Sequence, residues 1–226
     1  MQKKSQKQKN SKKYKLIIFD LDGTLINSLS FHLESFKELL LEHNIRMTEN
    51  KLLNLMGKPT QEILKELKKD HKFSEKIEDL REERRYHYFR LIGKRDLTFP
   101  NVKSMLSKLR PNYKLAVATG SSRIIFTHST DKDFQSNFDY VVTINDVKNG
   151  KPFPDQFLKA AKKLKVSPKD CLVIGDSLYD ADAARNAKMD FIGVLTGFTP
   201  ERQLKVHGAI QTLNSASHLP AILNKN

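Results

Sequence analysis

Two carboxylates stand two residues apart at the end of a short apolar run. Residues 15–19 (Lys-Leu-Ile-Ile-Phe) lead directly into Asp20-Leu-Asp22-Gly-Thr. The length and β-branching of the run predict a buried parallel strand that ends in a glycine turn. Both side chains can then point into one crevice, where one carboxylate attacks as a nucleophile and the other protonates a leaving oxygen and later activates water. The alternative is a strand that ends in an Asx turn, which would be favoured for a lone Asp-x-Asp-Gly motif, but the preceding strand favours the catalytic interpretation.

Small hydroxyl residues close a second apolar run, which extends from Lys114 to Thr119. Thr119, Gly120 and Ser121 lead from this run into a helical stretch. Their hydroxyl and backbone N–H groups are suited to donate hydrogen bonds to phosphate oxygens. The same residue types also make ordinary loops, so the other motifs decide how they are interpreted.

A lysine stands in a proline-rich segment further along the chain. Lys151 lies in Gly-Lys-Pro-Phe-Pro-Asp, and the prolines stiffen its backbone. A fixed ammonium group can neutralise the negative charge that develops on a pentacovalent phosphorus. The alternative is one more surface lysine.

Two further carboxylates follow the apolar run from Cys171 to Ile174. Asp176 and Asp180 are four residues apart, near the expected start of a helix. Carboxylates from different strand ends are ligands that Mg²⁺ prefers, with waters completing its octahedron. Helix capping would explain one acidic residue here, but not a third acidic centre at the edge where Asp20 and Asp22 are expected.

Strand-like and helical segments alternate over most of the chain. This pattern predicts an α/β fold with a doubly wound parallel sheet, whose ligands bind beyond the carboxyl ends of the strands. The expected strands are residues 15–20, 114–119, 140–143, 171–174 and 191–195, and the expected helices between them include residues 102–109, 155–164 and 180–187.

Residues 27–95 interrupt the alternation, because they show only helical periodicity. We interpret them as a small all-helical insert that follows the first strand and covers the strand ends as a lid would. The predicted division is a basic flexible tail over residues 1–14, a catalytic core over 15–26 and 96–226, and the helical cap over 27–95. Within the cap lie His32 and a basic cluster that could either attract anions or form a solvated helix face: Arg81, Arg84, Arg85, Arg90, Lys94 and Arg95.

The composition of the chain bears on its binding partners and its cellular location. The formal charge is +14, and seven lysines among the first 15 residues supply half of it. Such a tail could contact nucleic acid, although a solvated tail is the more usual form. The single cysteine allows no internal disulfide, and neither a secretory signal nor an apolar run of about 20 residues is present, so we expect a cytoplasmic protein without a membrane span.

In this order, Asp20-x-Asp22-Gly-Thr, Thr119, Lys151-Pro and Gly-Asp176-Ser-x-x-Asp180 resemble the four signature motifs of the haloacid dehalogenase superfamily. The insert resembles the cap of the phosphoglycolate phosphatase and β-phosphoglucomutase branch. The resemblance extends from about residue 15 to residue 223. It implies a Rossmann-like core and a phosphoric monoester hydrolase that acts through an aspartyl-phosphate.

Roles for individual residues follow from that resemblance. Asp20 would be the nucleophile, and Asp22 the general acid and base. Thr119, with Gly120 and Ser121, would bind the transferred phosphoryl group, which Lys151 would neutralise. A Mg²⁺ ion would be held by Asp20, the main-chain carbonyl of Asp22 and Asp176, with Asp180 in or next to the metal shell.

The resulting hypothesis is a Mg²⁺-dependent phosphatase that acts on a small phosphorylated metabolite. The first alternative is a sugar phosphomutase. Mutases of this family tend to have Glu-Asp-Ser-x-x-Gly where this chain has Gly175-Asp-Ser-x-x-Asp180, which resembles the phosphatases. The second alternative is a nucleic-acid-binding protein with a vestigial core. Intact acidic and basic residues in all the motifs disfavour it.

Overall fold

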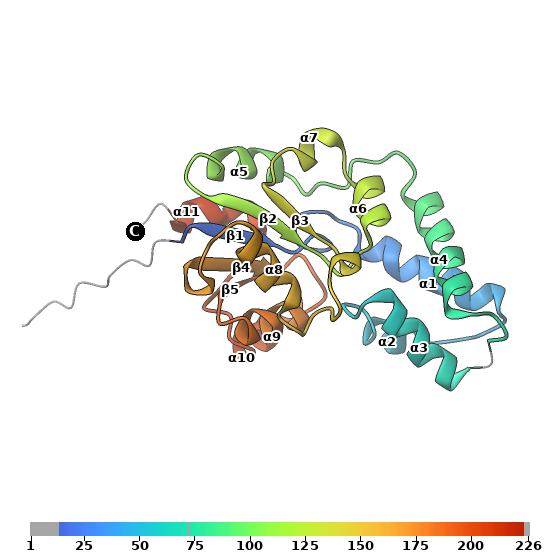
Figure 1. The fold of residues 1–226 in the computed structure, drawn as a ribbon. Coiled ribbons are helices and arrows are strands. Elements are labelled where there is room, and N and C mark those ends of the chain that lie inside the picture. The colour runs from blue at the N-terminus through green and yellow to red at the C-terminus, as the bar shows by residue number, and fades with distance from the viewer. Residues whose placement is uncertain (1–13, 72, 224–226) are drawn as a thin grey trace, which may run out of the picture.

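The structure, a computed structural model, describes residues 14–71 and 73–223. These residues form one six-stranded parallel sheet with helices around it. The strand order is β3-β2-β1-β4-β5-β6 (Figure 1). The strands are β1 (Leu16–Phe19), β2 (Lys114–Ala118), β3 (Tyr140–Val142), β4 (Cys171–Gly175), β5 (Asp190–Val194) and β6 (Gln211–Leu213). From β1 the chain first builds outward to β3 and then returns to the other side of β1 with β4. The order therefore reverses between β1 and β4, the position at which such sheets open a crevice.

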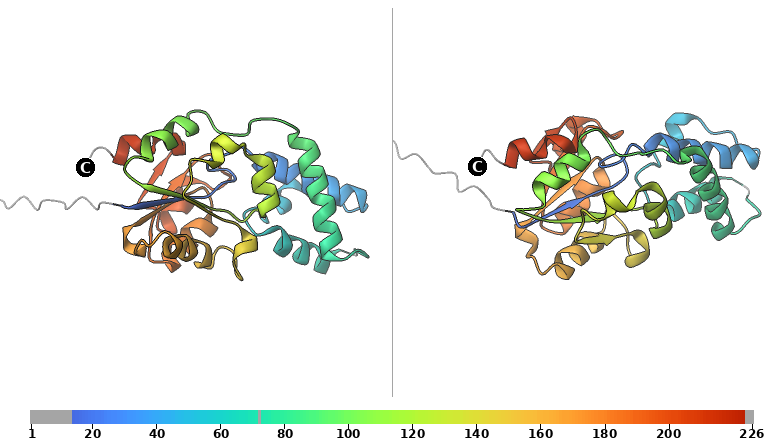
Figure 2. Two further views of the ribbon diagram at one scale, coloured as in Figure 1. Left: turned by 45° about the horizontal axis from the view of Figure 1, so that its top comes forward. Right: turned by 90° about the horizontal axis from the view of Figure 1, so that it is seen from above.

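Helices cover both faces of the sheet (Figures 1 and 2). Side chains alternate along β1, so Ile17 and Phe19 pack on one face and Leu16 and Ile18 on the other. The first face packs against α5 (Val102–Leu109), α6 (Arg123–Ser129), α7 (Lys132–Gln135) and α11 (Leu219–Leu223), and the second against α8 (Asp155–Lys163), α9 (Leu178–Asn186) and α10 (Glu201–Val206). The predicted doubly wound α/β fold is confirmed.

Two details differ from the sequence prediction. Strand β6 was not expected, because it has three residues at the sheet edge and only Leu213 of them is buried. Helix α9 begins two residues earlier than predicted. Its cap residue Ser177 and Asp180 satisfy each other's backbone N–H groups as a capping box, which fixes the first turn.

In its described residues, the interrupting segment contains four helices with a hydrophobic core of their own. These are α1 (Leu29–Glu42), α2 (Glu49–Leu53), α3 (Thr60–Asp70) and α4 (Ile77–Ile92). They lie together at one end of the sheet (Figure 2). The exact domain boundaries stay a prediction, and residues 1–13 of the proposed tail lie outside the described residues. In the described part of the chain, no helix has the length and apolar character needed to span a membrane.

Tyr88 of α4 links these helices to the sheet domain. Its side chain is buried within the core cluster on the α5 face of the sheet, and its hydroxyl forms a 3.0 Å hydrogen bond with that of Ser129. Its ring also stacks on the imidazole of His32, with 4.2 Å between ring centroids. His32 is thereby held on α1 in a fixed position relative to the strand ends.

Candidate active site

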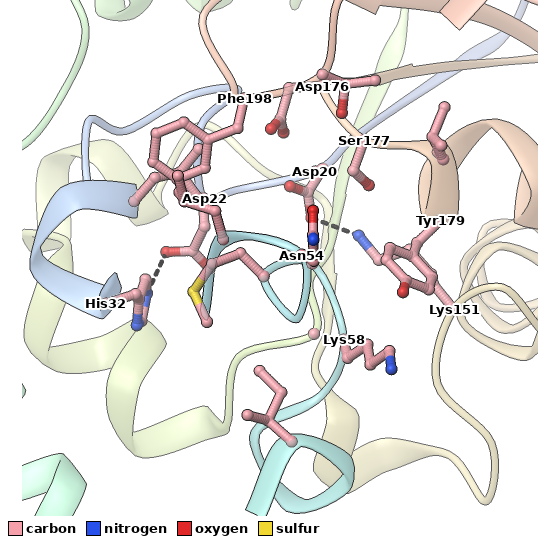
Figure 3. A pocket seen from close by; sticks show the side chains of 18 of the residues that line it. Asp20, Asp22, His32, Asn54, Lys58, Lys151, Asp176, Ser177, Tyr179 and Phe198 are labelled. Atoms are coloured by element: carbon pink, nitrogen blue, oxygen red, sulfur yellow. Dashed lines mark hydrogen bonds and ion pairs between the residues drawn. The ribbon is translucent and has the colours of Figure 1, made fainter. Parts of the chain in front are cut away.

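Three aspartates and a lysine come together where β1 and β4 end, and Figure 3 shows Asp20, Asp176 and Lys151 of this group. Phe19 lies opposite Ile174 in the parallel register, so the residues that follow the two strands emerge side by side. This places Asp20 next to Asp176, with Asp180 supplied by the first turn of α9. All three carboxyl groups and Lys151 are buried.

Lys151 bridges two of these carboxylates. Its Nζ donates to Asp20 Oδ1 at 2.5 Å and to Asp180 Oδ1 at 2.6 Å, and it also contacts the carbonyl of Ala118 at 3.3 Å. The second oxygen of Asp180 accepts hydrogen bonds from the backbone N–H and the hydroxyl of Ser177. Asp180 is therefore occupied on both sides, and it fixes the position of the ammonium group.

Burial and charge oppose each other at these groups. Burial by itself would lower the pKa of Lys151, but Asp180 and Asp20 raise it above its ordinary value, so the ammonium stays charged. Burial raises the pKa of Asp20 to about 7, with a further contribution from Asp180 and Asp22, while Lys151 acts in the opposite direction. A further cation next to Asp20 would favour its ionised form.

Asp176 has a hydrogen-bond donor but no cation in direct contact among the described residues. Thr24 Oγ1 donates to its Oδ1 at 2.9 Å. Burial, together with the charges of Asp20 and Asp180, raises the pKa of Asp176 well above its usual range. The backbone at Gly197 approaches so closely that a Cβ there would overlap the Asp176 carboxylate. The carboxylate is therefore held in one place although its surroundings disfavour its charge.

This arrangement fits a divalent cation. Carboxylate oxygens of Asp20, Asp176 and Asp180 all lie within 4.8 Å of one another. Lys151 supplies one positive charge against three carboxyl groups, and a hard cation would relieve the remaining repulsion. Because Lys151 and Ser177 already occupy the oxygens of Asp180, Asp20 and Asp176 have the greater capacity to bind a metal ion.

Asp22 points away from Asp20 toward the helical segment (Figure 3). Its carboxylate accepts hydrogen bonds from Ser28 at 2.6 Å, Ser121 at 2.7 Å and His32 at 3.0 Å, with Thr119 at 3.3 Å. Burial alone would raise the pKa of Asp22, but His32 and the two serine hydroxyls hold it well below its usual range. In this conformation Asp22 is a carboxylate anion.

The hydrogen bonds of His32 assign its tautomer. Arg84 Nη1 can only donate, and it lies 3.1 Å from His32 Nδ1. Nδ1 is therefore the acceptor, and Nε2 carries the proton that is donated to Asp22. Arg84 on α4 is thus connected to Asp22 through the imidazole ring on α1.

The loop after β2 contacts Asp22 in this conformation. The hydroxyls of Thr119 and Ser121 both donate to Asp22, and Thr119 Oγ1 also accepts from the backbone N–H of Ser121. Gly120 and Ser121 line a cavity of about 460 Å³ that also reaches Asp20, Lys151 and Asp176. Nothing lies within 4 Å of the position that a Cβ on Gly120 would take, so this part of the loop is open to a ligand.

Sequence reasoning missed some residues of the site. Ser28, which donates to Asp22, gives no distinctive pattern as a single hydroxyl residue. Thr24 belongs to the first motif, where its hydroxyl is expected to hold the turn, but its contact with Asp176 was not predicted. Arg84 was placed in a basic cluster with two open interpretations, although it is 1% exposed. The sequence pattern could have predicted that Arg84 is buried. Leu80, Arg84 and Tyr88 recur at intervals of four, so Arg84 shares a helix face with two hydrophobic residues.

Comparisons with known proteins find similar proteins over most of the chain. The family model described as haloacid dehalogenase-like hydrolase matches residues 17–194. The crystal structure of a hydrolase from Pseudomonas syringae is 31% identical, with a TM-score of 0.82, and the match covers 93% of this chain and 98% of that one. The fructose-1-phosphate phosphatase YqaB of Escherichia coli is 30% identical over 191 residues, or 80% of this chain and 97% of that protein.

A longer relative is matched only in part. The bifunctional riboflavin kinase/FMN phosphatase of Arabidopsis thaliana is 30% identical over 181 residues, which is 79% of this chain and 48% of that protein. This chain therefore spans about half the length of that relative.

The Lys151 bridge predicts a specific stability effect. Lys151→Met leaves two buried carboxylates without their cation, so we expect the free energy of unfolding to fall by about 3 kcal/mol in metal-free buffer at pH 8. The matched control is Lys103→Met, because Lys103 also contacts two aspartates, at 3.2 and 2.9 Å, but at the surface. That change should cost less than about 1 kcal/mol.

Urea denaturation of both variants measures the difference. The deficit of Lys151→Met should shrink at pH 5, because carboxyl groups with a raised pKa take up protons there and lose their repulsion. Equal losses in the two variants would show that the buried bridge contributes no more than a surface pair.

Proposed function

Because the chain belongs to the haloacid dehalogenase-like hydrolase family, we propose that it is a Mg²⁺-dependent phosphatase that transfers the phosphoryl group of a small metabolite to Asp20. The observation that carries this proposal is the 2.5 Å contact between the buried Lys151 ammonium and Asp20, next to Asp176 at the adjacent strand end. Two of the relatives named above are a fructose-1-phosphate phosphatase and a bifunctional riboflavin kinase/FMN phosphatase. Their activities support the reaction class and leave the substrate open.

Asp20 would act as the nucleophile. One of its carboxylate oxygens forms a bond to phosphorus while the ester P–O bond breaks, and the leaving oxygen takes a proton. Lys151 supports this step, because it favours the ionised form of Asp20 and offers positive charge to the equatorial oxygens. Water would then attack phosphorus, which releases inorganic phosphate and restores the Asp20 carboxylate.

Asp22 would move the protons in both steps. It would protonate the leaving oxygen in the first step and accept a proton from water in the second. Its present hydrogen bonds to Ser28, Ser121 and His32 favour the anion, the form needed in the second step. The first step needs a protonated Asp22, so at least part of this set must be released when substrate enters.

Mg²⁺ would be held by Asp20, Asp176 and the main-chain carbonyl of Asp22. When bound, it would screen the repulsion between the anionic ester and the Asp20 carboxylate. Asp180 would orient Lys151, since its two oxygens are already used by Lys151 and Ser177. The open loop at Gly120, with the Thr119 and Ser121 hydroxyls, would bind the phosphoryl oxygens.

Gly175 and Asp180 support hydrolysis over transfer to a second sugar hydroxyl. A Cβ on Gly175 would lie 2.5 Å from Asp180 Cγ, so these two positions have room for only one side chain. The mutase pattern places Glu and Gly here, and this chain places Gly and Asp. In this chain the space is therefore filled by the Asp180 side chain of α9, which binds Lys151. A cytoplasmic location stays a proposal.

The direct test is phosphate release from a panel of phosphomonoesters with and without Mg²⁺. We expect release with Mg²⁺, none in excess EDTA, and little with Ca²⁺, which takes more ligands at longer distances. Asp176→Asn should need at least about tenfold more Mg²⁺ for half-maximal rate. Asp170→Asn is the control, because Asp170 precedes β4 at the opposite end of the strand and pairs with Lys15. Full activity in chelator would remove the metal from the mechanism.

The proposed role of Asp22 predicts a dependence on the leaving group. Asp22→Asn should lower kcat/KM for an alkyl phosphate by a factor of about 100 to 10,000, because an alkoxide needs a proton to leave. The loss for p-nitrophenyl phosphate should be at least about tenfold smaller, because its leaving group departs as a stable anion. Rates for both esters in the wild-type and variant proteins provide the comparison. Equal losses would assign Asp22 to positioning alone.

A further inference from the structure

The helical wall of the cavity contains a buried cation without an acidic partner among the residues that the structure describes. Arg84 lines the cavity and is 1% exposed. Neighbouring arginines do have partners, since Arg85 pairs with Glu82 and Arg90 with Glu38 at 2.5 Å. Arg84 thus differs from Arg85 and Arg90 of the same helix in both burial and pairing.

Only one end of the guanidinium is used. Nη1 donates to His32 Nδ1 at 3.1 Å and approaches Ser35 Oγ at 3.5 Å. Nε is buried and has no hydrogen-bond partner, and for Nη2 the described residues provide none either. The Nε–Nη2 edge is the fork that binds a carboxylate or phosphate through two parallel hydrogen bonds.

Aromatic rings fix the plane of this fork. The guanidinium carbon lies 4.9 Å from the ring centroid of Phe36 and 5.7 Å from that of Tyr88. Burial lowers the pKa of Arg84 only to about 10, so the group keeps its charge at neutral pH. The guanidinium group of Arg84 is charged, fixed in orientation and has free donors on its Nε–Nη2 edge, so it is preorganised to bind an anion.

The charges that line the cavity are segregated. Its carboxylates all come from the sheet domain: Asp20, Asp22, Asp176 and Asp182. The described lining residues of α1–α4 and their loops include two cations, Lys58 and Arg84, and no acidic residue. Lys58 is neutralised by Glu66 at 2.5 Å, whereas Arg84 is not neutralised. The part of a substrate that faces these helices therefore meets a positive charge that no carboxylate of the described residues contacts directly.

We propose that the substrate carries a second anionic group, a carboxylate or a second phosphate, which binds the Nε–Nη2 edge of Arg84. This inference rests on the proposed function, which places the reacting phosphoryl group at Asp20 and Lys151. A neutral group at the same place would leave the buried fork unpaired, and a site built for a hydrogen-bonding group rejects analogues that lack it. Arg84 would thus select the substrate as well as orient His32.

Binding of inert analogues tests the proposal. Phosphonates with a terminal carboxylate two to five carbons away are compared with their carboxamides, and with bisphosphonates of the same lengths, by calorimetry of the full chain in Mg²⁺. We expect at least one anion-bearing compound to bind at least about tenfold tighter than its amide. The carboxylate and bisphosphonate arms identify which anion is preferred.

Variants of Arg84 test its part in this preference. Arg84→Met should reduce the ratio of affinities between the anion and its amide to within about threefold of unity, and Arg84→Lys should retain an intermediate ratio, because it keeps the charge without the fork. Arg85→Met, the neighbour paired with Glu82, should keep the wild-type ratio. A purely structural Arg84 would weaken both ligands equally.

The outcomes distinguish a failure of the second-anion inference from a failure of the phosphatase proposal. If the wild-type protein binds every anion and its amide equally well, or if Arg84→Met keeps the preference, the second-anion inference is wrong while the phosphatase proposal stands. If no phosphonate binds in the presence of Mg²⁺, the proposed function fails, and the inference fails with it.

Discussion

The structure of the site depends on one buried ammonium group between two carboxylates. Lys151 contacts both Asp20 and Asp180, and without it three carboxyl groups would face one another away from water. The parallel register of β1 and β4 imposes this crowding, because it brings the residues after both strands to one edge. The capping box of α9 then fixes Asp180, so the fold that concentrates the negative charge also positions the cation that makes it tolerable.

A second constraint connects the inserted helices to the chemistry. Asp22 follows β1, but His32 on α1 donates to it, and Arg84 on α4 determines which ring nitrogen of His32 carries the proton. Any movement of these helices relative to the sheet would change the hydrogen bonds of Asp22, and with them its pKa. The arrangement therefore couples the proton-transfer residue to whatever occupies the cavity beneath the helices.

The sequence was most informative where a side chain follows a buried strand. The near-continuous apolar runs of β1 and β4 predicted parallel strands, and parallel strands end at one edge, so Asp20 and Asp176 could be expected together. Contacts that depend on how the inserted helices pack could not be predicted. The link from Arg84 through His32 to Asp22 depends on how α1 and α4 pack on each other, and strand β6 depends on an edge with a single buried side chain.

Trapping the phosphorylated enzyme tests the central claim most directly. Wild-type protein is mixed with a ³²P-labelled phosphomonoester and Mg²⁺, quenched in acid within milliseconds, digested and mapped. The account predicts an acid-stable label on the peptide that contains Asp20, which disappears in a chase with unlabelled substrate and is absent from Asp20→Asn. Phosphate release without any labelled peptide, or a label retained in Asp20→Asn, would contradict covalent catalysis by Asp20.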